Sequence, residues 1–152
     1  METLKSLSGK KIELEIISPD RIVLQDSADY VVLPAKKGEC AILPGHAHFL
    51  TELNGGELRV INDGEIRHLA VSGGFAQASP NKIQVFAETA EMAKEIDTDR
   101  ANLAAERAQQ KLRDKALPID QIAIAQAELS RALIRLRVSA NLKKKHPHRQ
   151  PS

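Results

Sequence analysis

The first ninety residues alternate between apolar and polar positions in short runs. Ile12, Leu14 and Ile16 alternate with charged residues, which is the period-two pattern of a strand with one buried face. Further short apolar runs follow, three of which end at Pro34, Pro44 or Asn62, and they cover 22–24, 30–33, 41–43, 58–61, 66–69 and 83–87. Asn62-Asp63-Gly64 has the turn chemistry of a β-hairpin. This pattern predicts an antiparallel β-sandwich or barrel over residues 1–90.

The hydrophobic period changes from two to that of a helix after Ile96. Asp97 is a suitable N-cap, and Asp99 in the next turn suits the positive end of the helix dipole. The alanines that follow share one helical face. Pro118 fits the first turn of a second helix, in which apolar residues repeat at heptad spacing; they are Ile122, Ala125, Leu129, Ala132 and Leu136. Residues 91–142 are therefore predicted to form an antiparallel two-helix hairpin, which makes the fold class α+β.

Alanine dominates the faces on which these two helices would meet. An alanine buries much less apolar area than a leucine, so such a hairpin gains little stability from its own packing. A weakly packed hairpin could detach and repack on a partner. A static hairpin fixed on the sheet fits the same pattern, and the sequence leaves both alternatives open.

Composition separates the same two halves by charge. Residues 1–96 hold 10 Lys/Arg and 14 Asp/Glu, a net charge of −4, whereas residues 97–152 hold 12 and 6, a net charge of +6. The basic half is expected to meet an acidic partner. Aromatic residues are only 3% and Trp is absent, which argues against a nucleic-acid partner. Residues 143–152 are predicted to form a basic disordered tail.

Neither a membrane-crossing segment nor a secretory leader is indicated by the sequence. No apolar run approaches the length of about eighteen residues that a membrane helix needs. Met1 to Lys11 has no apolar core, and the single cysteine, Cys40, fits a reducing compartment. A soluble, cytosolic protein is expected.

No catalytic or metal centre can be assembled from the motifs. Cys40, His46 and His48 suggest zinc ligands but lack a fourth ligand and the usual paired spacing. Ser72-Gly73-Gly74 lacks the flanks of a nucleophile turn, and no Walker-type glycine loop is present. We therefore predict no enzymatic activity for this chain and no bound metal.

Arginines form the one polar group that suggests binding. Asp97, Arg100 and Arg107 project from neighbouring positions of the first helix, and Arg131 and Arg135 are four apart on the second. A closed hairpin could join these arginines into one patch suited to phosphate contact. The alternative is a solvated helix face with ion pairs such as Arg131 with Glu128.

Four segments of the chain resemble a known family over roughly residues 10–142. They are Asp29-Tyr30-Val31-Val32-Leu33-Pro34, Gly38-Glu39-Cys40-Ala41-Ile42-Leu43-Pro44-Gly45-His46-Ala47, Val71-Ser72-Gly73-Gly74-Phe75 and Ala87-Glu88-Thr89-Ala90-Glu91. In this order, and followed by a helical hairpin, they resemble the epsilon subunit of bacterial F-type ATP synthases.

The resemblance implies a non-catalytic role in the central stalk of that rotary enzyme. It implies a β-sandwich that binds the gamma subunit and the ring of c subunits. It also implies a hairpin that folds on the sandwich or extends into the catalytic alpha and beta subunits, where it meets an acidic segment of beta and inhibits ATP hydrolysis. A peripheral position on the cytoplasmic face of the bacterial inner membrane follows from the same resemblance.

The resemblance also implies a regulatory ATP site, although no cofactor is required. The family motif is matched by Ile96-Asp97-Thr98-Asp99-Arg100-Ala101. Glu91 and Arg107 match the flanking residues of members that bind ATP, and Arg131 and Arg135 match two arginines of the second helix. ATP bound across both helices would favour the closed hairpin and relieve inhibition.

Some residues depart from the family pattern, and two other functions stay open. His48 stands where proline is usual, Cys40 replaces an aromatic or aliphatic residue and Ala35 replaces a glycine, all near loops expected to face the shaft and ring. The alternatives are a β-sandwich adaptor unrelated to rotary catalysis and a nucleotide-sensing regulator of another enzyme.

Overall fold

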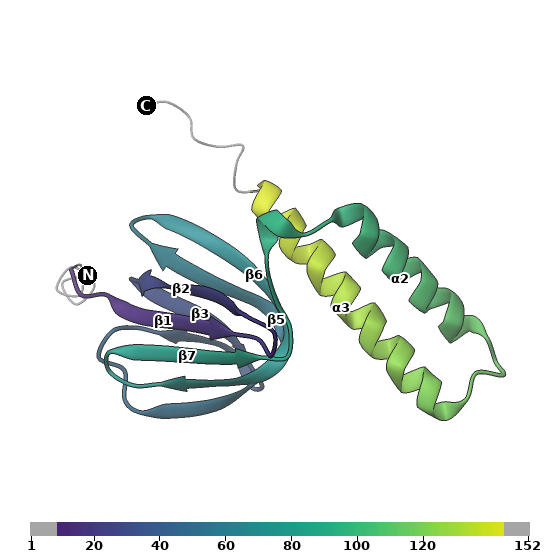
Figure 1. Ribbon diagram of the computed structural model, residues 1–152, viewed down its shortest axis with the longest axis horizontal. Coiled ribbons are helices and arrows are strands. Elements are labelled where there is room, and N and C mark those ends of the chain that lie inside the picture. Colours follow the sequence, from purple (N-terminus) through teal and green to yellow (C-terminus); the bar gives the residue numbers. More distant parts are fainter. Residues whose placement is uncertain (1–8, 145–152) are drawn as a thin grey trace. The chain divides into compact units, whose positions relative to one another are not determined.

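A computed structural model describes residues 9–144. The chain divides into two compact units between Met92 and Ala93. The first unit contains eight strands, which are β1 (Ile12–Ile17), β2 (Ile22–Ala28), β3 (Tyr30–Ala35), β4 (Gly38–Ile42), β5 (Phe49–Asn62), β6 (Glu65–Ala78), β7 (Lys82–Ala87) and β8 (Ala90–Met92). The second contains η1 (Ala93–Glu95), α2 (Thr98–Arg113) and α3 (Ile119–Lys144) (Figure 1).

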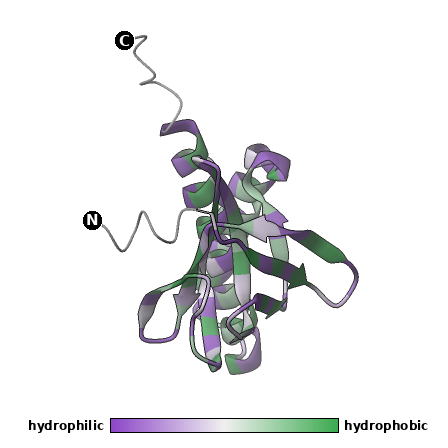
Figure 2. Ribbon diagram, turned by 90° about the vertical axis from the view of Figure 1, so that its left-hand side faces the viewer, coloured by the Kyte–Doolittle hydropathy of each residue, from purple (hydrophilic) through white to green (hydrophobic). Residues whose placement is uncertain are grey.

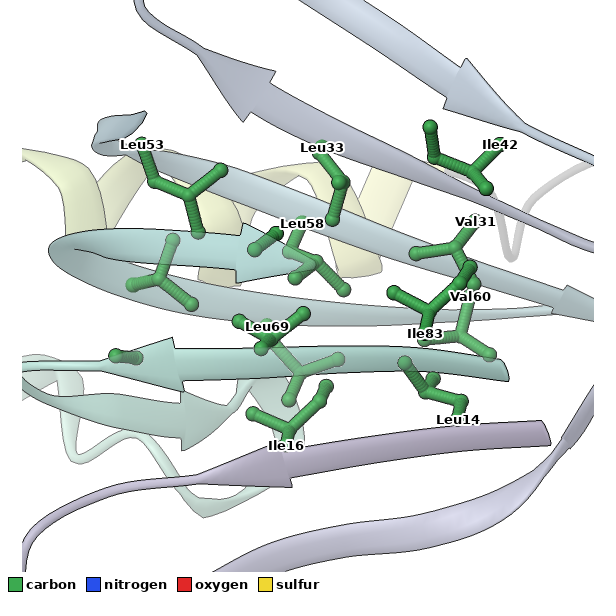
Figure 3. Packing of buried hydrophobic residues seen from close by; sticks show 14 of the residues in the cluster. Leu14, Ile16, Val31, Leu33, Ile42, Leu53, Leu58, Val60, Leu69 and Ile83 are labelled. Carbon is green, nitrogen blue, oxygen red and sulfur yellow. The ribbon is translucent and has the colours of Figure 1, made fainter. Parts of the chain in front are cut away.

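The strands of the first unit form one sheet that bends over on itself around a shared core. Their order is β2-β1-β7-β6-β5-β3-β4, and β8 pairs with β6. Strands from both ends of this order contribute buried side chains to one cluster: Leu14 and Ile16 of β1 lie with Val31 and Leu33 of β3 (Figure 3). The predicted β-sandwich is confirmed by this arrangement.

One pair of strands departs from the antiparallel prediction. β1 pairs with β7 in parallel, whereas it pairs with β2 antiparallel. The first strand lies between β2, its neighbour in sequence, and β7, which follows it about seventy residues later in the chain. A pairing between strands so far apart in sequence leaves no signal in local periodicity.

Alternation along the strands follows from their one buried face. Along β7, residues Ile83, Val85 and Ala87 are buried, and the residues between them are less buried. Figure 2 shows hydrophobic and hydrophilic residues alternating along the strands in this manner. The alternation of apolar and polar residues in the sequence therefore indicates which side of each strand faces the core.

Glycines shape the two longest strands, β5 and β6, at two places. Asp63 and Gly64 form the two-residue loop between β5 and β6, and both have positive φ, 51° and 78°. At Gly73-Gly74, β6 passes from its pairing with β8 to its pairing with β7. A Cβ on Gly74 would lie 2.0 Å from the carbonyl oxygen of Phe86, so only glycine allows this backbone approach.

The second unit is the predicted helical hairpin. Its two helices are joined by the short turn 114–118 and pack through small residues, Ala101, Ala105 and Ala108 of α2 and Ala125 and Ala132 of α3, which we call the alanine seam. α3 continues through Lys144, so the expectation that a disordered tail begins at 143 is wrong for its first two residues. Residues 145–152 lie outside the described part of the chain. Within residues 9–144, no helix is long and apolar enough to cross a membrane.

Candidate functional site

The start of α2 is fixed by an aspartate cap. The backbone N–H of Ile96 donates to the carbonyl of Ala93 at 3.3 Å, which closes η1. Asp97 Oδ1 then accepts from the backbone N–H groups of Asp99 and Arg100, both at 3.1 Å. This geometry satisfies two of the N–H groups that a helix leaves unpaired at its start. Asp97 therefore has a structural role that needs no ligand.

Ala101, the last residue of the matched motif, is part of the alanine seam. Its backbone N–H donates to the carbonyl of Asp97 at 3.0 Å, and its side chain is buried. A larger residue would push the two helices apart, since seams of small residues permit close approach. Its place in the motif is explained by helix packing.

Arginine and lysine side chains form a stripe along α2 beside this seam. Arg100, Arg107 and Lys111 follow one another at spacings of seven and four residues, so they project from the same side of the helix. The stripe runs from the first turn of α2 to its last turn. It contains Arg100 and Arg107, the two α2 arginines of the predicted patch.

A matching stripe on α3 consists of Glu128, Arg131 and Arg135, at spacings of three and four residues. Lys111 Nζ lies 3.4 Å from Glu128 Oε2. This ion pair joins the α2 stripe to the α3 stripe, so both lie along the same side of the hairpin. We call the combined surface the arginine stripe.

The ion pair between Lys111 and Glu128 also shows which arginines of α2 and α3 lie beside each other along the hairpin. One turn back from Lys111 on α2 is Arg107, and about one turn forward from Glu128 on α3 is Arg131. Because the helices are antiparallel, these two steps lead in the same direction, away from the turn at 114–118. Arg107 and Arg131 therefore lie at the same level on facing helices, and Arg100 and Arg135 lie farther along the same side.

Within the described chain, three arginines of the stripe lack the ion pairs expected on a solvated helix face. Glu128, the expected partner of Arg131, lies instead against Lys111. Among residues 9–144, no carboxylate lies within ion-pair distance of Arg100, Arg107 or Arg131. A surface with several unneutralised guanidinium groups on one side attracts anions, and guanidinium is suited to bidentate contact with phosphate.

Glu91 belongs to the sandwich unit and not to the helical unit that carries the arginine stripe. It lies on β8, where it pairs with Ala70 of β6. The remaining seven matched residues, Ile96, Asp97, Arg100, Ala101, Arg107, Arg131 and Arg135, belong to the helical unit. The structure thus collects the four arginines on one side of the hairpin and gives Ile96, Asp97 and Ala101 places at the start of α2.

Lys111 is the member of the stripe that the sequence did not suggest, and Glu128 was expected only as an ion-pair partner of Arg131. The signal was present, since Lys111 lies four residues after Arg107 and Glu128 three before Arg131, both on the same helical side. Only the register between the helices shows that they meet.

The other candidate chemistries have structural explanations. Cys40 packs against the hydrophobic core, and within the described residues no three His, Cys, Asp or Glu side chains are placed to hold a metal ion. The Ser72 hydroxyl accepts a hydrogen bond from the Thr89 hydroxyl at 2.6 Å, and the adjacent glycines shape the strand crossover. These residues contribute to the fold.

Comparison with known proteins agrees with both units. Residues 11–93 match the β-sandwich domain of the ATP synthase delta/epsilon chain, and residues 94–140 match its long alpha-helix domain. The ATP synthase epsilon chain of Nitratidesulfovibrio vulgaris is 47% identical over 132 residues, which cover 87% of this chain and 98% of the relative. The epsilon chain of Dehalococcoides mccartyi is 42% identical over 137 residues, covering 90% and 97%.

The fold also occurs in a solved assembly. A chain in the structure of the Euglena gracilis mitochondrial ATP synthase, comprising OSCP, F1 and c-ring, superposes with a TM-score of 0.63 at 23% identity, covering 89% of this chain and 81% of that one. Two consecutive family matches span the chain from residue 11 to residue 140, and relatives above 40% identity match at nearly their full length. The chain therefore belongs to the ATP synthase delta/epsilon chain family.

Proposed function

We propose that this chain is an ATP-responsive brake on the rotary enzyme to which its family belongs. As an epsilon-type subunit of the ATP synthase stalk it is not itself catalytic. In the proposal, its helical hairpin restrains ATP hydrolysis, and ATP bound on the arginine stripe holds the hairpin closed and relieves that restraint. The observation that carries the proposal is the arginine stripe itself.

The geometry of the stripe suits a ligand that touches both helices. Arg107 and Arg131 are level on facing helices, so one polyphosphate could contact both, and Arg100 and Arg135 extend the surface by further turns. A ligand bridging two helices binds the closed arrangement better than an open one. It therefore shifts the equilibrium toward the closed hairpin by its differential affinity.

The alanine seam makes such a shift energetically accessible. Ala101, Ala105 and Ala132 are buried, but each removes little apolar area from water. A ligand present at 100 times its dissociation constant stabilises the bound state by about 2.7 kcal/mol. That is comparable with the marginal stability expected for two helices held together by small residues.

The partners in this proposal are the gamma subunit and c-subunit ring for the sandwich, and the catalytic alpha and beta subunits for the hairpin. The basic helical half, with its net charge of +6, suits the acidic segment of beta that the family resemblance implies. In this proposal the chain is peripheral to the cytoplasmic face of the inner membrane.

Calorimetric titration of the full chain with ATP tests the site directly. We expect saturable heat for the unmodified chain and at least tenfold weaker binding after Arg107→Ala with Arg131→Ala. The matched control is Arg113→Ala with Arg137→Ala, which removes the same charge from the same two helices at positions off the arginine stripe. The control should retain affinity within about twofold.

Two results would overturn the ATP site. One is the absence of heat at millimolar ATP, and the other is an equal loss of affinity in the stripe variant and its control, which would indicate only general charge attraction. Inhibition is tested separately by adding the chain back to the catalytic complex depleted of it. Hydrolysis should fall on addition and recover as ATP rises; unchanged hydrolysis would contradict the brake.

A further inference from the structure

His68 of β6 is a buried titratable side chain on the outer face of the sandwich. Its neighbour Leu69 belongs to the core, so the imidazole projects to the opposite side of the strand. Only 2% of the His68 side chain is exposed. Burying a polar group costs free energy unless the group finds a partner, so the surroundings of this imidazole decide what it can do.

A buried carboxylate of the neighbouring strand lies next to the imidazole. His68 Nδ1 is 3.3 Å from Glu57 Oε1 of β5, and the Glu57 side chain is 9% exposed. Within the described chain, Nδ1 nevertheless has no hydrogen-bond partner. An imidazole nitrogen without a proton cannot donate to a carboxylate, whereas both nitrogens of a protonated imidazole are donors. A proton on Nδ1 would therefore complete the contact with Glu57.

Arg59 extends this contact to the edge of the layer. It lies directly opposite His68 on β5, and its Nη1 is 3.4 Å from Glu57 Oε1, the same oxygen that faces the imidazole. The guanidinium also donates to both carboxylate oxygens of Glu39 on β4, each at 3.1 Å, which is the strong bidentate arrangement. Four side chains, Glu39, Arg59, Glu57 and His68, thus connect β4 with β6 across β3 and β5, and we call them the His68 network.

The charges of the His68 network do not balance while the imidazole is neutral. The two carboxylates, Glu39 and Glu57, carry two negative charges against the single positive charge of Arg59. A proton on His68 would bring the sum to zero. Charges that are shielded from water are screened less than charges at the surface, and an adjacent carboxylate favours the protonated form of a histidine.

The other strands around His68 add one more carboxylate and no further cation at the paired outward positions. β3 presents Val32, which lies opposite Arg59. β8 presents Glu91, which lies opposite Ala70 of β6 and therefore projects to the same side as Glu57. The outward positions on either side of His68 along β6 itself, Ile66 and Ala70, are apolar. The surrounding strands therefore favour the uptake of a proton.

We propose that the His68 network is a proton-operated lock within the sandwich. When a proton from solvent binds His68 Nδ1, this nitrogen donates to Glu57 Oε1 and the network becomes neutral. β6 is then fastened to β5 and, through Arg59 and Glu39, to the edge strand β4. When the proton leaves, the donor is lost. The sandwich thereby has a pH response of its own, which depends neither on ATP nor on the arginine stripe.

Proton linkage gives the direction of this response. Stability rises as the pH falls wherever the folded state binds more protons than the unfolded state. A histidine in an unfolded chain has no fixed partner and titrates near pH 6.5. The stabilisation by the lock is therefore complete below about pH 6.5 and is lost as the pH rises above neutrality.

Urea unfolding of the full chain at pH 8 and at pH 6, followed by the amide NMR signals of β5 and β6, tests the lock. The unfolding equilibrium constant of the unmodified chain should fall by at least about fivefold from pH 8 to pH 6. In His68→Gln and in Glu57→Gln it should change by less than about twofold, because one half of the pair is missing. The matched control is His48→Gln, which removes an exposed histidine of the same unit and should keep the full response.

The unmodified chain supplies a second measurement that does not depend on whether the variants fold. The NMR signals of the His68 imidazole should shift between pH 8 and pH 6 while the chain stays folded, and a constant imidazole signal over this range would overturn the proposal. The same pH response in the unmodified chain and in His68→Gln would also overturn it. Equal destabilisation of His68→Gln at both pH values would leave His68 with a packing role alone and no lock.

Discussion

The sandwich and the hairpin bury different kinds of side chain. The largest fully buried residues all belong to the sandwich; they include Ile12, Leu14, Ile16, Leu33, Ile42, Leu58, Leu69 and Ile83. In α2 and α3 the buried apolar residues are alanines and Val138, and the one buried polar residue is Ser139. A fully buried leucine or isoleucine contributes about 1.5–3 kcal/mol, and an alanine much less. The sandwich is therefore expected to be the more stable unit, and the hairpin to be the unit that opens and repacks more easily.

Truncating the sandwich core should give the largest effect. Leu58 is fully buried between the layers, so Leu58→Ala should lower the free energy of unfolding by about 2–5 kcal/mol through lost burial and a residual cavity. Urea unfolding, followed by the amide NMR signals of the sandwich strands, measures this change. The result would show that the core of large aliphatic residues carries the stability of this unit.

The matched control is the same chemical change in the hairpin. Leu103 of α2 is 50% exposed, so Leu103→Ala should change stability by less than about 0.5 kcal/mol. If both variants lost the same stability, the contrast between a well-packed sandwich and a weakly packed hairpin would be untenable.

The sandwich could be predicted from sequence because its alternation is local. Ile83, Val85 and Ala87 alternate with less buried residues, and the turn at Asp63-Gly64 needs the positive φ values that those residues tolerate. The parallel pairing of β1 with β7 could not be predicted, since it joins strands about seventy residues apart.

The sequence predicts on which side of each helix the arginines of the candidate site lie, but not how the two helices are aligned with each other along their length. The spacing of Arg100 and Arg107, and of Arg131 and Arg135, places each pair on one side of its helix. Lys111 contacts Glu128, which leaves Arg131 without that partner. This contact depends on how the two helices are aligned along their length. Side-chain spacing within one helix carries no information on that register.

Removing the cap of α2 should have an intermediate effect confined to the hairpin. Asp97→Ala deletes the acceptor for the N–H groups of Asp99 and Arg100, and loss of such a cap costs about 1 kcal/mol. Amide hydrogen exchange should accelerate several-fold in the first turn of α2 and remain unchanged in the sandwich strands. Faster exchange in β5 and β6 would show that the two units are not energetically distinct.

Asp120→Ala is the control for this change. It likewise removes one acidic residue near the start of a helix, but in the first turn of α3. It should leave exchange at the start of α2 unaltered. Equal acceleration in both variants would attribute the effect to net charge instead of capping.

The smallest expected effect concerns a polar cluster at one end of the sandwich. Lys11 Nζ contacts Asp29 Oδ1 at 2.6 Å and Asp63 Oδ1 at 2.7 Å, and the N–H of Asp63 donates to Asp29 Oδ2 at 2.8 Å. The hydrogen bond from Lys11, followed by that from Asp63, lowers the pKa of Asp29 below 3.8, and the hydrogen bonds from Lys11 to Asp29 and Asp63 raise the pKa of Lys11 above 10.5. The groups are exposed to solvent, so salt screens them and the contribution is small.

The signs of the two pKa changes define where this contribution is lost. Asp29 contributes stability above pH 3.8, and this contribution disappears as the pH falls through the lower pKa that Asp29 has in the folded state. The contribution of Lys11 is complete below pH 10.5, and it disappears as the pH rises through the higher pKa that Lys11 has in the folded state. In urea unfolding between pH 2 and pH 7, Asp29→Asn should therefore flatten the acid limb of the sandwich's stability curve. Glu65→Gln, at the other side of the same turn, should leave that limb unchanged. An acid limb that is equally steep in Asp29→Asn and the unmodified chain would show that this cluster, unlike the aliphatic core, does not contribute to the stability of the sandwich.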